Sequence, residues 1–256
     1  MKFDDLDQKM RLFETANDQC ALPGIWIIAR IDGRSFTRLT KEIHKFEAPY
    51  DEQFREHMVA TVLHLMNCGF RIPYGYTQSD EISLLFHKEE GLFDRKLRKW
   101  VSVLAGEASA AFSIRLGVAA AFDCRLSQLT DETLVRDYFL WRQEDAHRNA
   151  LNAHCYWTLR SNGSLGQQAT ERLLRLSVSD KNELLFSHGV NFGKLPNWQK
   201  RGIGVVWENY EKPAINPKTG QAVKAIRRRL KAEYELPARA DYASFLEQRI
   251  QEAKTN

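Results

Sequence analysis

Apolar and polar positions along the first half of the chain follow two periods, one typical of strands and one typical of helices. Residues 24–31 and 118–122 are short apolar runs, so each predicts a buried strand. Apolar side chains recur at helical spacing over 51–66, where Asp51 can cap the helix, and over 97–112. The pattern therefore predicts two strands and two helices in this region.

A β-hairpin is predicted between these two helices, over residues 70–86. Its turn is expected near 73–75, where proline and glycine interrupt the pattern, and its second strand is expected to begin at Asp80. The resulting order β-α-β-β-α-β is that of a ferredoxin-like layer, an antiparallel sheet with helices on one face. We therefore predict an α+β fold in which residues 1–126 form a palm-like portion.

The pattern changes near residue 126, after which helical spacing predominates. Three stretches predict helices, at 131–159, 164–175 and 179–187. Two apolar stretches follow at 203–207 and 223–230, and the turn-like sequence of 216–220 separates them. Residues 127–256 are therefore predicted to form a mostly helical portion with a late β-hairpin, packed as one unit with the palm.

Composition indicates a folded chain with a mildly basic charge. Its 256 residues are 43% hydrophobic and 27% charged, which is too apolar for a disordered protein. No apolar run approaches the ~20 residues of a membrane span, and the acidic start of the chain argues against a secretory leader. The four cysteines are scattered, so we expect reduced thiols and a cytoplasmic location. A net charge of +4 permits nucleic-acid binding without indicating it.

Two aspartates adjoin predicted strands that are neighbours in a ferredoxin-like sheet. Asp32 follows the first strand and Asp80 opens the second hairpin strand, so we expect both carboxylates at one sheet edge. Carboxylates there suit Mg²⁺, and two such ions can stabilise an in-line displacement at phosphorus. The carbonyl of Gly33 can add a ligand because glycine allows close approach of the backbone. Either motif alone matches an ordinary turn more often than a site, but the pair favours a metal site.

Phosphate-binding groups are expected around this edge. Main-chain amides that can form an anion nest belong to Arg34, Ser35, Phe36 and Thr37. Lys96 and Lys99 lie in the first turns of a predicted helix, where a bound anion and a solvated basic face explain them equally well. Glu81 alternates away from Asp80 along the strand, so a supporting or structural role competes with a catalytic one.

The strongest basic cluster lies in the late hairpin, at 224–231. It contains Arg227, Arg228 and Arg229, and tryptophan and tyrosine side chains are close in the sequence. Cations interleaved with aromatic side chains suit a nucleic-acid backbone. An edge strand guarded by solvated cations is the competing interpretation.

Four ordered motifs resemble the tRNA(His) guanylyltransferase family, which includes the guanylyltransferase-like 3′–5′ polymerases of bacteria and archaea. The motifs are Arg30-Ile31-Asp32-Gly33-Arg34-Ser35-Phe36, Gln78-Ser79-Asp80-Glu81, Trp141-Arg142-Gln143-x-Asp145-x-His147-x-Asn149 and Asp180-Lys181-Asn182-Glu183. The resemblance implies a polymerase-like palm that works in the reverse direction. A nucleoside triphosphate activates the 5′ end of a tRNA, and the 3′-hydroxyl of an incoming nucleotide then attacks that end.

The resemblance also implies roles for individual residues. Asp32 and Asp80 match the side-chain ligands of two Mg²⁺ ions, and Gly33 matches a carbonyl ligand. Residues that match contacts to the triphosphate of ATP or GTP are Ser79, Lys96 and Lys99. Those that match positions tied to activation or tRNA handling are Arg125, Arg142, His147, Lys181 and Asn191. A homotetramer built as a dimer of dimers is implied as well.

Three positions depart from the family pattern. Thr37 stands where a histidine is usual, and Ala48 stands where a lysine is usual, which removes one expected triphosphate contact. Ala150 replaces the second asparagine of a run tied to selecting tRNA(His). These departures favour the repair-type branch, which adds nucleotides opposite a template to 5′-truncated tRNAs, over G addition to tRNA(His).

Two other functions stay open on the sequence. A palm with two aspartates also suits a nucleotide cyclase or a similar signalling enzyme, which forms a cyclic product from ATP or GTP in the absence of tRNA. The altered Thr37 and Ala48 are also compatible with a non-catalytic tRNA-binding protein.

Overall fold

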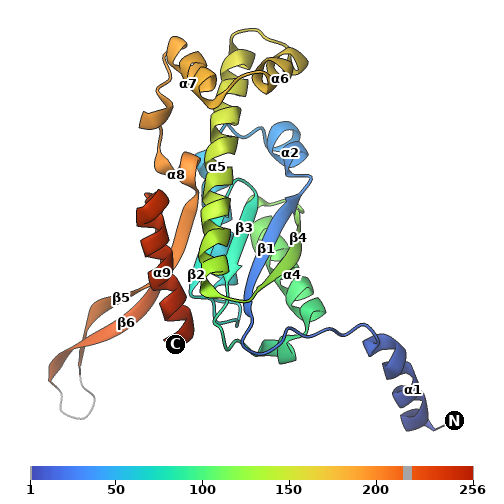
Figure 1. Cartoon of the computed structure of the whole chain (residues 1–256). Helices are drawn as coiled ribbons and strands as arrows, with labels where there is room; N and C mark the ends of the chain where they lie inside the picture. The colour runs from blue at the N-terminus through green and yellow to red at the C-terminus, as the bar shows by residue number, and fades with distance from the viewer. Residues whose placement is uncertain (1, 216–220, 256) are drawn as a thin grey trace.

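A single antiparallel sheet forms the centre of the protein in the computed structural model, which describes residues 2–215 and 221–255 (Figure 1). Its strands are β1 (Trp26–Arg34), β2 (Tyr74–Gln78), β3 (Glu81–Leu85), β4 (Ala121–Leu129), β5 (Ile203–Ile215) and β6 (Ala222–Glu233). They lie in the order β4-β1-β3-β2-β5-β6. The predicted ferredoxin-like order is confirmed for β1 to β4. The late hairpin is confirmed too, but its pairing with β2 was not predicted.

Helices cover both faces of this sheet. They are α1 (Phe3–Thr15), α2 (Phe36–Arg38), α3 (Glu52–Leu65), α4 (Leu97–Leu116), α5 (Glu132–Ser161), α6 (Gly166–Leu174), α7 (Val178–Ser187), α8 (Asn197–Arg201) and α9 (Arg239–Thr255). Short turns of other helix types are η1 (Leu39–Ile43), η2 (Leu92–Arg95) and η3 (Phe192–Lys194). Helices α3 and α4 cover one face, as predicted, whereas α5 and α9 cover the other. The two helices predicted on one face of the palm are confirmed, and α5 returns to the sheet to cover the other face.

Strand alternation divides the buried side chains between two cores. On β1, Ile27 and Ile31 join the core beneath α3 and α4, whereas Trp26 and Ile28 join the core beneath α5 and α9. Asp32 is in phase with the second pair, so its carboxylate emerges at the end of β1 on the face that α5 covers. The hydrophobic alternation of one strand thus sets the side on which this acid lies.

Helix α5 joins the sheet to the remaining helices. It has 30 residues, or ~45 Å of helix. Its first half packs on the sheet, and its second half meets α6 and α7 through a small core. Members of this core include Leu151, Cys155, Leu159, Leu173 and Leu185. The three helices predicted in this region are confirmed, with ends that differ by at most two residues.

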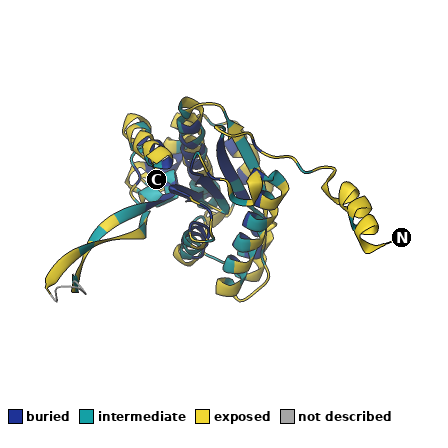
Figure 2. Ribbon diagram, turned by 90° about the horizontal axis from the view of Figure 1, so that it is seen from below, coloured by how far each residue is buried: buried dark blue, intermediate teal, exposed yellow. Residues whose placement is uncertain are grey.

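Helix α1 and the β5–β6 hairpin project from the body (Figures 1 and 2). Helix α1 has no buried residue. The hairpin strands pair from Gly204 and Glu233 out to Ile215 and Ala222, so both are longer than the apolar stretches that predicted them. The turn predicted at 216–220 lies outside the described residues.

The two predicted portions share one sheet, because β2 from the palm pairs with β5 from the later half. A boundary near residue 126 therefore stays a prediction. In the described part of the chain, no helix combines the length and apolarity needed to cross a membrane.

Candidate active site

A tight turn formed by Ser79 and Asp80 joins β2 to β3. Ser79 has a φ of 50°, the left-handed conformation that such a turn requires. The turn predicted at 73–75 is wrong, because Gly75 belongs to β2 and packs under α3. A Cβ on Gly75 would lie 2.6 Å from Cγ1 of Val62, so this glycine serves close packing rather than a turn.

Asp32 and Asp80 meet at one edge of the sheet. Gly33 donates its amide hydrogen to the carbonyl oxygen of Asp80, with an N···O distance of 3.0 Å, and so joins the end of β1 to the β2–β3 turn. Burial, together with the negative charge of Asp32 nearby, raises the pKa of Asp80 to about 6. Burial and the charge of Glu81 also raise the pKa of Asp32. The two carboxylates therefore converge as expected, and their role as metal ligands stays a prediction.

The donor set at this edge fits Mg²⁺. Both aspartates have raised pKa values because their carboxylates are partly buried close to other acidic groups. A divalent cation bound between them would neutralise this negative charge. Arg30 and Arg125 approach Asp32 at the same oxygen, Oδ2, at 3.7 and 3.8 Å. Within residues 2–215 and 221–255 no three histidine, cysteine or acidic side chains cluster around a possible ion. Two carboxylates with a backbone carbonyl suit Mg²⁺, which takes its other ligands from water and phosphate oxygens.

Phe36 is the reason for glycine at position 33. A Cβ on Gly33 would lie 2.5 Å from Cδ2 of Phe36, too close for any other residue type without a shift. The Phe36 ring is buried against Phe54, Phe112 and Phe122, with centroid distances of 4.9 to 6.1 Å. Its side chain therefore belongs to the core, and only its main chain remains available for the predicted phosphate contact.

We expect Gly33→Ala to destabilise the fold and to lower activity by displacing the end of β1. The added methyl group collides with a buried ring, and overpacking of this kind costs about 1–3 kcal/mol. Thermal unfolding measures the first effect and nucleotide incorporation the second. Gly106→Ala is the matched control, since a Cβ there meets no heavy atom within 4 Å and alanine favours the helix. An unchanged Tm for Gly33→Ala would contradict the close packing.

Glu81 binds two arginines next to the aspartates. Its carboxylate accepts hydrogen bonds from Arg30 on β1 and from Arg142 on α5. Arg142 is only 2% exposed and also donates to Oδ2 of Asp145 at 3.0 Å. This network fixes α5 against the ends of β1 and β3 beside Asp32. The structure therefore supports a positioning role for Glu81, and the catalytic role considered for it stays a prediction.

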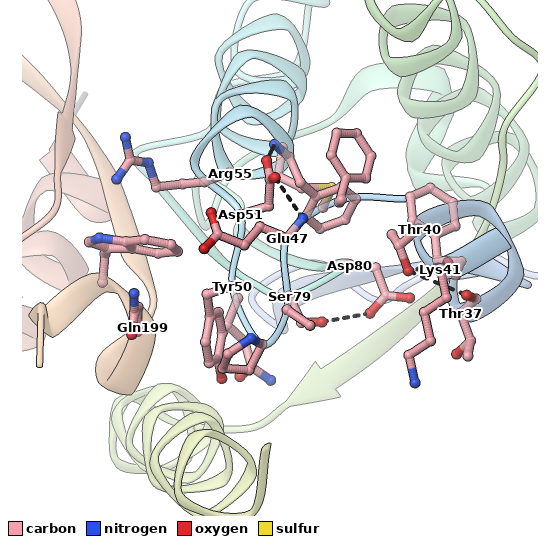
Figure 3. Close-up of a pocket in the computed structure, with 18 of the residues that line it drawn as sticks. Thr37, Thr40, Lys41, Glu47, Tyr50, Asp51, Arg55, Ser79, Asp80 and Gln199 are labelled. Carbon is pink, nitrogen blue, oxygen red and sulfur yellow. Dashed lines mark hydrogen bonds between the residues drawn. The ribbon is translucent and has the colours of Figure 1, made fainter. Parts of the chain in front are cut away.

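A cavity of about 530 Å³ opens beside the turn (Figure 3). This volume suits a nucleotide-sized ligand. Residues that line the end near the turn include Thr37, Thr40, Lys41, Ser79 and Asp80. Residues that line the other end include Tyr50, Arg55 and Trp198. Thr37 and Ser79 thus lie where a nucleotide contact was expected, whereas the anion nest around Arg34 and Ser35 stays a prediction.

Lys96 and Lys99 lie at the opposite end of the sheet from the aspartates. Lys96 caps the start of α4, forms a β-bridge with Cys20 and lies 3.8 Å from Asp18. These partners lead into the start of β1, which is ~20 Å from Asp32 near its end. Within one chain, the two lysines do not lie beside the aspartates, because α4 begins after β3 has run away from the turn. Their expected triphosphate contact stays a prediction.

Arg125 lies beside the aspartates, as expected for a residue of the site. It comes from β4, which pairs with β1, and its guanidinium reaches Asp32 at 3.8 Å and Asp123 at 3.4 Å. Its guanidinium neutralises part of the negative charge at this edge. The same group can donate hydrogen bonds to a phosphate there.

The other residues linked to tRNA handling lie farther along α5 or on elements packed against its second half. The ring of His147 meets the ring of Phe192 edge-on at 5.3 Å, and partial burial lowers the pKa of His147. The carbonyl of Lys181 accepts from the thiol of Cys155, ~20 Å along the helix from the Glu81 network. Asn191 precedes η3 and is exposed. The structure does not bring these three residues to the aspartates, so their roles stay predictions.

The three arginines of the basic cluster lie on the projecting hairpin and are exposed. The guanidinium of Arg228 lies over the ring of Trp207 at 4.9 Å, and Arg229 pairs with Glu208 at 2.6 Å. Arg227 lies on the same strand, β6. This cluster is separate from the aspartate edge, so any contact with RNA is made at a second surface.

Sequence reasoning missed most of the cavity lining. Tyr50 and Arg55 flank the start of α3, Trp157 lies near the end of α5, and Trp198 lies on α8. These side chains meet only because α5 and α8 fold back over the palm. The usable signal was local, since the segment that directly follows Asp32, residues 34–50, contains several cations and aromatic residues.

Comparisons with known proteins place the chain in a family. A sequence model described as tRNAHis guanylyltransferase matches residues 7–130, and a model of that family's C-terminal domain matches residues 133–243. A probable tRNA(His) guanylyltransferase of Drosophila melanogaster is 35% identical over 195 residues, which cover 72% of this chain and 68% of that protein. The chain belongs to the tRNA(His) guanylyltransferase family. The tRNA(His) guanylyltransferase of Neurospora crassa is 34% identical over 203 residues, covering 74% of this chain and 69% of the relative.

Solved structures agree with membership in the tRNA(His) guanylyltransferase family. A bacterial tRNA(His) guanylyltransferase-like protein in complex with GTP is 28% identical and has a TM-score of 0.76, covering 96% of this chain and 99% of the other. The tRNA(His) guanylyltransferase of Saccharomyces cerevisiae is 26% identical, with a TM-score of 0.71 and coverage of 80% and 93%. As a member of this family, the protein is a nucleotidyltransferase.

Proposed function

We propose that this protein is a Mg²⁺-dependent, template-directed 3′–5′ nucleotidyltransferase that adds nucleotides, with GTP favoured, to the 5′ end of tRNA. The observation that carries the proposal is the convergence of Asp32 and Asp80 beside a nucleotide-sized cavity. A similar bacterial protein binds GTP, and a second structure of such a protein, 26% identical, holds ATP. Both support nucleoside triphosphates as substrates.

The proposed reaction has two displacements at phosphorus. First, the 5′-monophosphate of the tRNA attacks the α-phosphorus of a nucleoside triphosphate, and pyrophosphate leaves. Second, the 3′-hydroxyl of the incoming nucleotide attacks the 5′-phosphorus, and the activating nucleoside monophosphate leaves as the new phosphodiester forms. A 5′-triphosphate end needs only the second displacement, in which pyrophosphate leaves.

The residues of the chain prepare this site in distinct ways. Asp32, Asp80 and the carbonyl of Gly33 would hold Mg²⁺, which supplies charge neutralisation to the phosphates and acidity to the attacking hydroxyl. The Ser79 hydroxyl donates to Oδ1 of Asp80 at 3.1 Å and so orients that carboxylate. Glu81 holds Arg30 and Arg142 in place, which keeps α5 fixed over the site.

Repair of 5′-truncated tRNA is the activity that the departures favour. Ala150 is fully buried in the small core between α5, α6 and α7, so its side chain makes no contact with a bound tRNA. The position tied to selecting tRNA(His) is therefore a packing position in this chain. Addition of G to tRNA(His) is the second activity to compare.

Extension of 5′-truncated tRNAs tests the proposal. The protein, Mg²⁺ and the four nucleoside triphosphates are incubated with 5′-monophosphorylated or 5′-triphosphorylated tRNA that lacks one 5′ nucleotide. We expect addition of the nucleotide complementary to the template position. Formation of a cyclic nucleotide without tRNA would favour the cyclase alternative. Binding of tRNA with no addition in Mg²⁺ or Mn²⁺ would favour the non-catalytic one.

We expect the basic hairpin to hold the phosphate backbone of tRNA. Replacing Arg227, Arg228 and Arg229 together with alanine should weaken tRNA binding and reduce the slope of log Kd against log salt by up to about 3, about one for each lost phosphate contact. Binding is measured by fluorescence anisotropy between low and moderate salt. A triple alanine variant of Lys2, Lys9 and Arg11, exposed cations near the start of the chain, is the control. An unchanged slope for the hairpin variant would remove this role.

We also propose a cytoplasmic homotetramer, built as a dimer of dimers. The four free cysteines support a reducing compartment. The exposed apolar side chains of α1 support burial against another copy, since this helix contributes nothing to the core of its own chain. Light scattering should give a mass close to four times 29.7 kDa.

A further inference from the structure

The cations of the cavity lie on one short segment. Lys41 and Lys45 line it from η1 and the residues that follow, and both side chains are exposed. The third cation of the lining, Arg55, pairs with Glu56 at 2.9 Å and lies over the ring of Trp198 at 4.6 Å. Among the described lining residues, the two lysines are therefore the cations that no carboxylate engages.

Lys41 lies at the end of the cavity that holds Asp80. Its four-residue spacing from Thr37 puts both side chains on one face of the segment, and Figure 3 shows them beside Asp80. The ammonium of Lys41 lies 5.5 Å from the ring centroid of Trp157, which α5 carries. A cation over an aromatic face is held weakly enough to exchange that contact for a phosphate.

A triphosphate brings several negative charges next to the carboxylates of Asp32 and Asp80. Mg²⁺ at the aspartates offsets part of that charge, and the outer phosphates still need a cationic partner. We propose that Lys41, supported by Lys45, binds the β- and γ-phosphates of the nucleoside triphosphate in this cavity. The inference rests on the proposed function, and it assigns the triphosphate tail to the η1 segment.

Ala48 lines the same cavity and contributes only a methyl group. A lysine introduced at this position would bring an ammonium group to the same lining from a different part of the backbone. Ala48→Lys therefore separates the need for a positive charge from the need for the particular backbone of η1.

Binding of GTP and GMP in Mg²⁺, measured by isothermal titration calorimetry, tests the assignment. We expect Lys41→Ala to weaken GTP binding about tenfold, the loss of a charge-assisted contact, and GMP binding less than twofold. Lys41→Ala/Lys45→Ala should weaken GTP binding further. Arg38→Ala is the matched control, since Arg38 lies on the same segment, is exposed and does not belong to the lining.

Adding Ala48→Lys to the double variant should recover GTP affinity to within a few-fold of the wild type. GTP affinity that is unchanged in the double variant would overturn the inference. Equal losses for GTP and GMP would also overturn it, since they indicate collapse of the segment. A wild type that binds GTP no better than GMP would do the same. Preferential GTP binding without any addition to tRNA would leave this assignment intact and overturn the proposed function.

Discussion

Asp80→Asn is expected to abolish nucleotide addition while making the metal-free protein more stable. The substitution removes a proposed ligand of Mg²⁺ and leaves the turn and the hydrogen bond from Ser79 available. Loss of metal-based charge stabilisation worth several kcal/mol corresponds to a rate that falls by about three orders of magnitude. Single-turnover extension of a 5′-triphosphorylated truncated tRNA measures the loss, because that substrate bypasses activation.

The stability gain follows from the direction of the pKa shift. The pKa of Asp80 is about 6 in the folded protein against an ordinary value of 3.8, so ionising it costs folding free energy. The cost is absent below about pH 4 and fully present above about pH 6, where it reaches about 3 kcal/mol at most. Asparagine carries no charge, so the free energy of unfolding of the variant should exceed that of the wild type at pH 7.5 and match it near pH 4.

Mg²⁺ should reverse this ranking. A cation that binds the folded protein alone stabilises it by mass action, so Mg²⁺ should raise the Tm of the wild type and leave Asp80→Asn unchanged. Asp123→Asn is the control, since Asp123 is exposed on the neighbouring strand and lies outside the proposed ligand set. Full activity of Asp80→Asn, or equal Tm responses of both proteins to Mg²⁺, would refute the metal site.

Much of the sheet was predictable because its signals are local. The apolar run of β1 and the helical spacing of α3, α4 and α5 each lie within one segment of the chain. The pairing of β5 with β2 joins residues more than 120 positions apart, and no local pattern encodes it. Helix α9 was missed although Tyr242, Leu246, Ile250 and Ala253 recur at helical spacing, because charged residues fill the positions between them.

The site was predicted where its residues adjoin the ends of strands, and missed where helices contribute. The positions of Asp32 and Asp80 follow from the order of strands in the sheet. Lys96 and Lys99 lie away from this edge because α4 follows the end of β3 that points away from Asp80, which the predicted order of elements already implied. The contact of Arg142 with Glu81 depends on how α5 returns to the sheet, so its partner was also beyond sequence reasoning.

Arg142→Ala is expected to destabilise the protein and to impair the metal site together. Removing one partner from a buried ionic network costs about 3–5 kcal/mol, which lowers the Tm by roughly 6–20 °C for a protein of this size. Arg142 also joins α5 to the sheet through Glu81 and Asp145, so the loss loosens the packing above Asp32. Arg142→Lys keeps the charge without the two-pronged geometry and should fall between the two proteins.

The Mg²⁺ concentration needed for activity distinguishes a positioning role of the Glu81 network from a purely stabilising one. Arg30 contacts Glu81 and lies 3.7 Å from Oδ2 of Asp32, so neutralising Glu81 frees Arg30 to pair with Asp32 and compete with the metal. Glu81→Gln should therefore raise the Mg²⁺ concentration for half-maximal activity about tenfold, with a smaller change in the KM for GTP. Arg142→Met alone leaves the charge of Glu81 without this partner. The double variant Arg142→Met/Glu81→Gln removes that charge too, so it should be more stable than Arg142→Met but should not recover Mg²⁺ affinity. A Mg²⁺ requirement that stays at the wild-type value in Glu81→Gln would restrict this network to holding α5 in place.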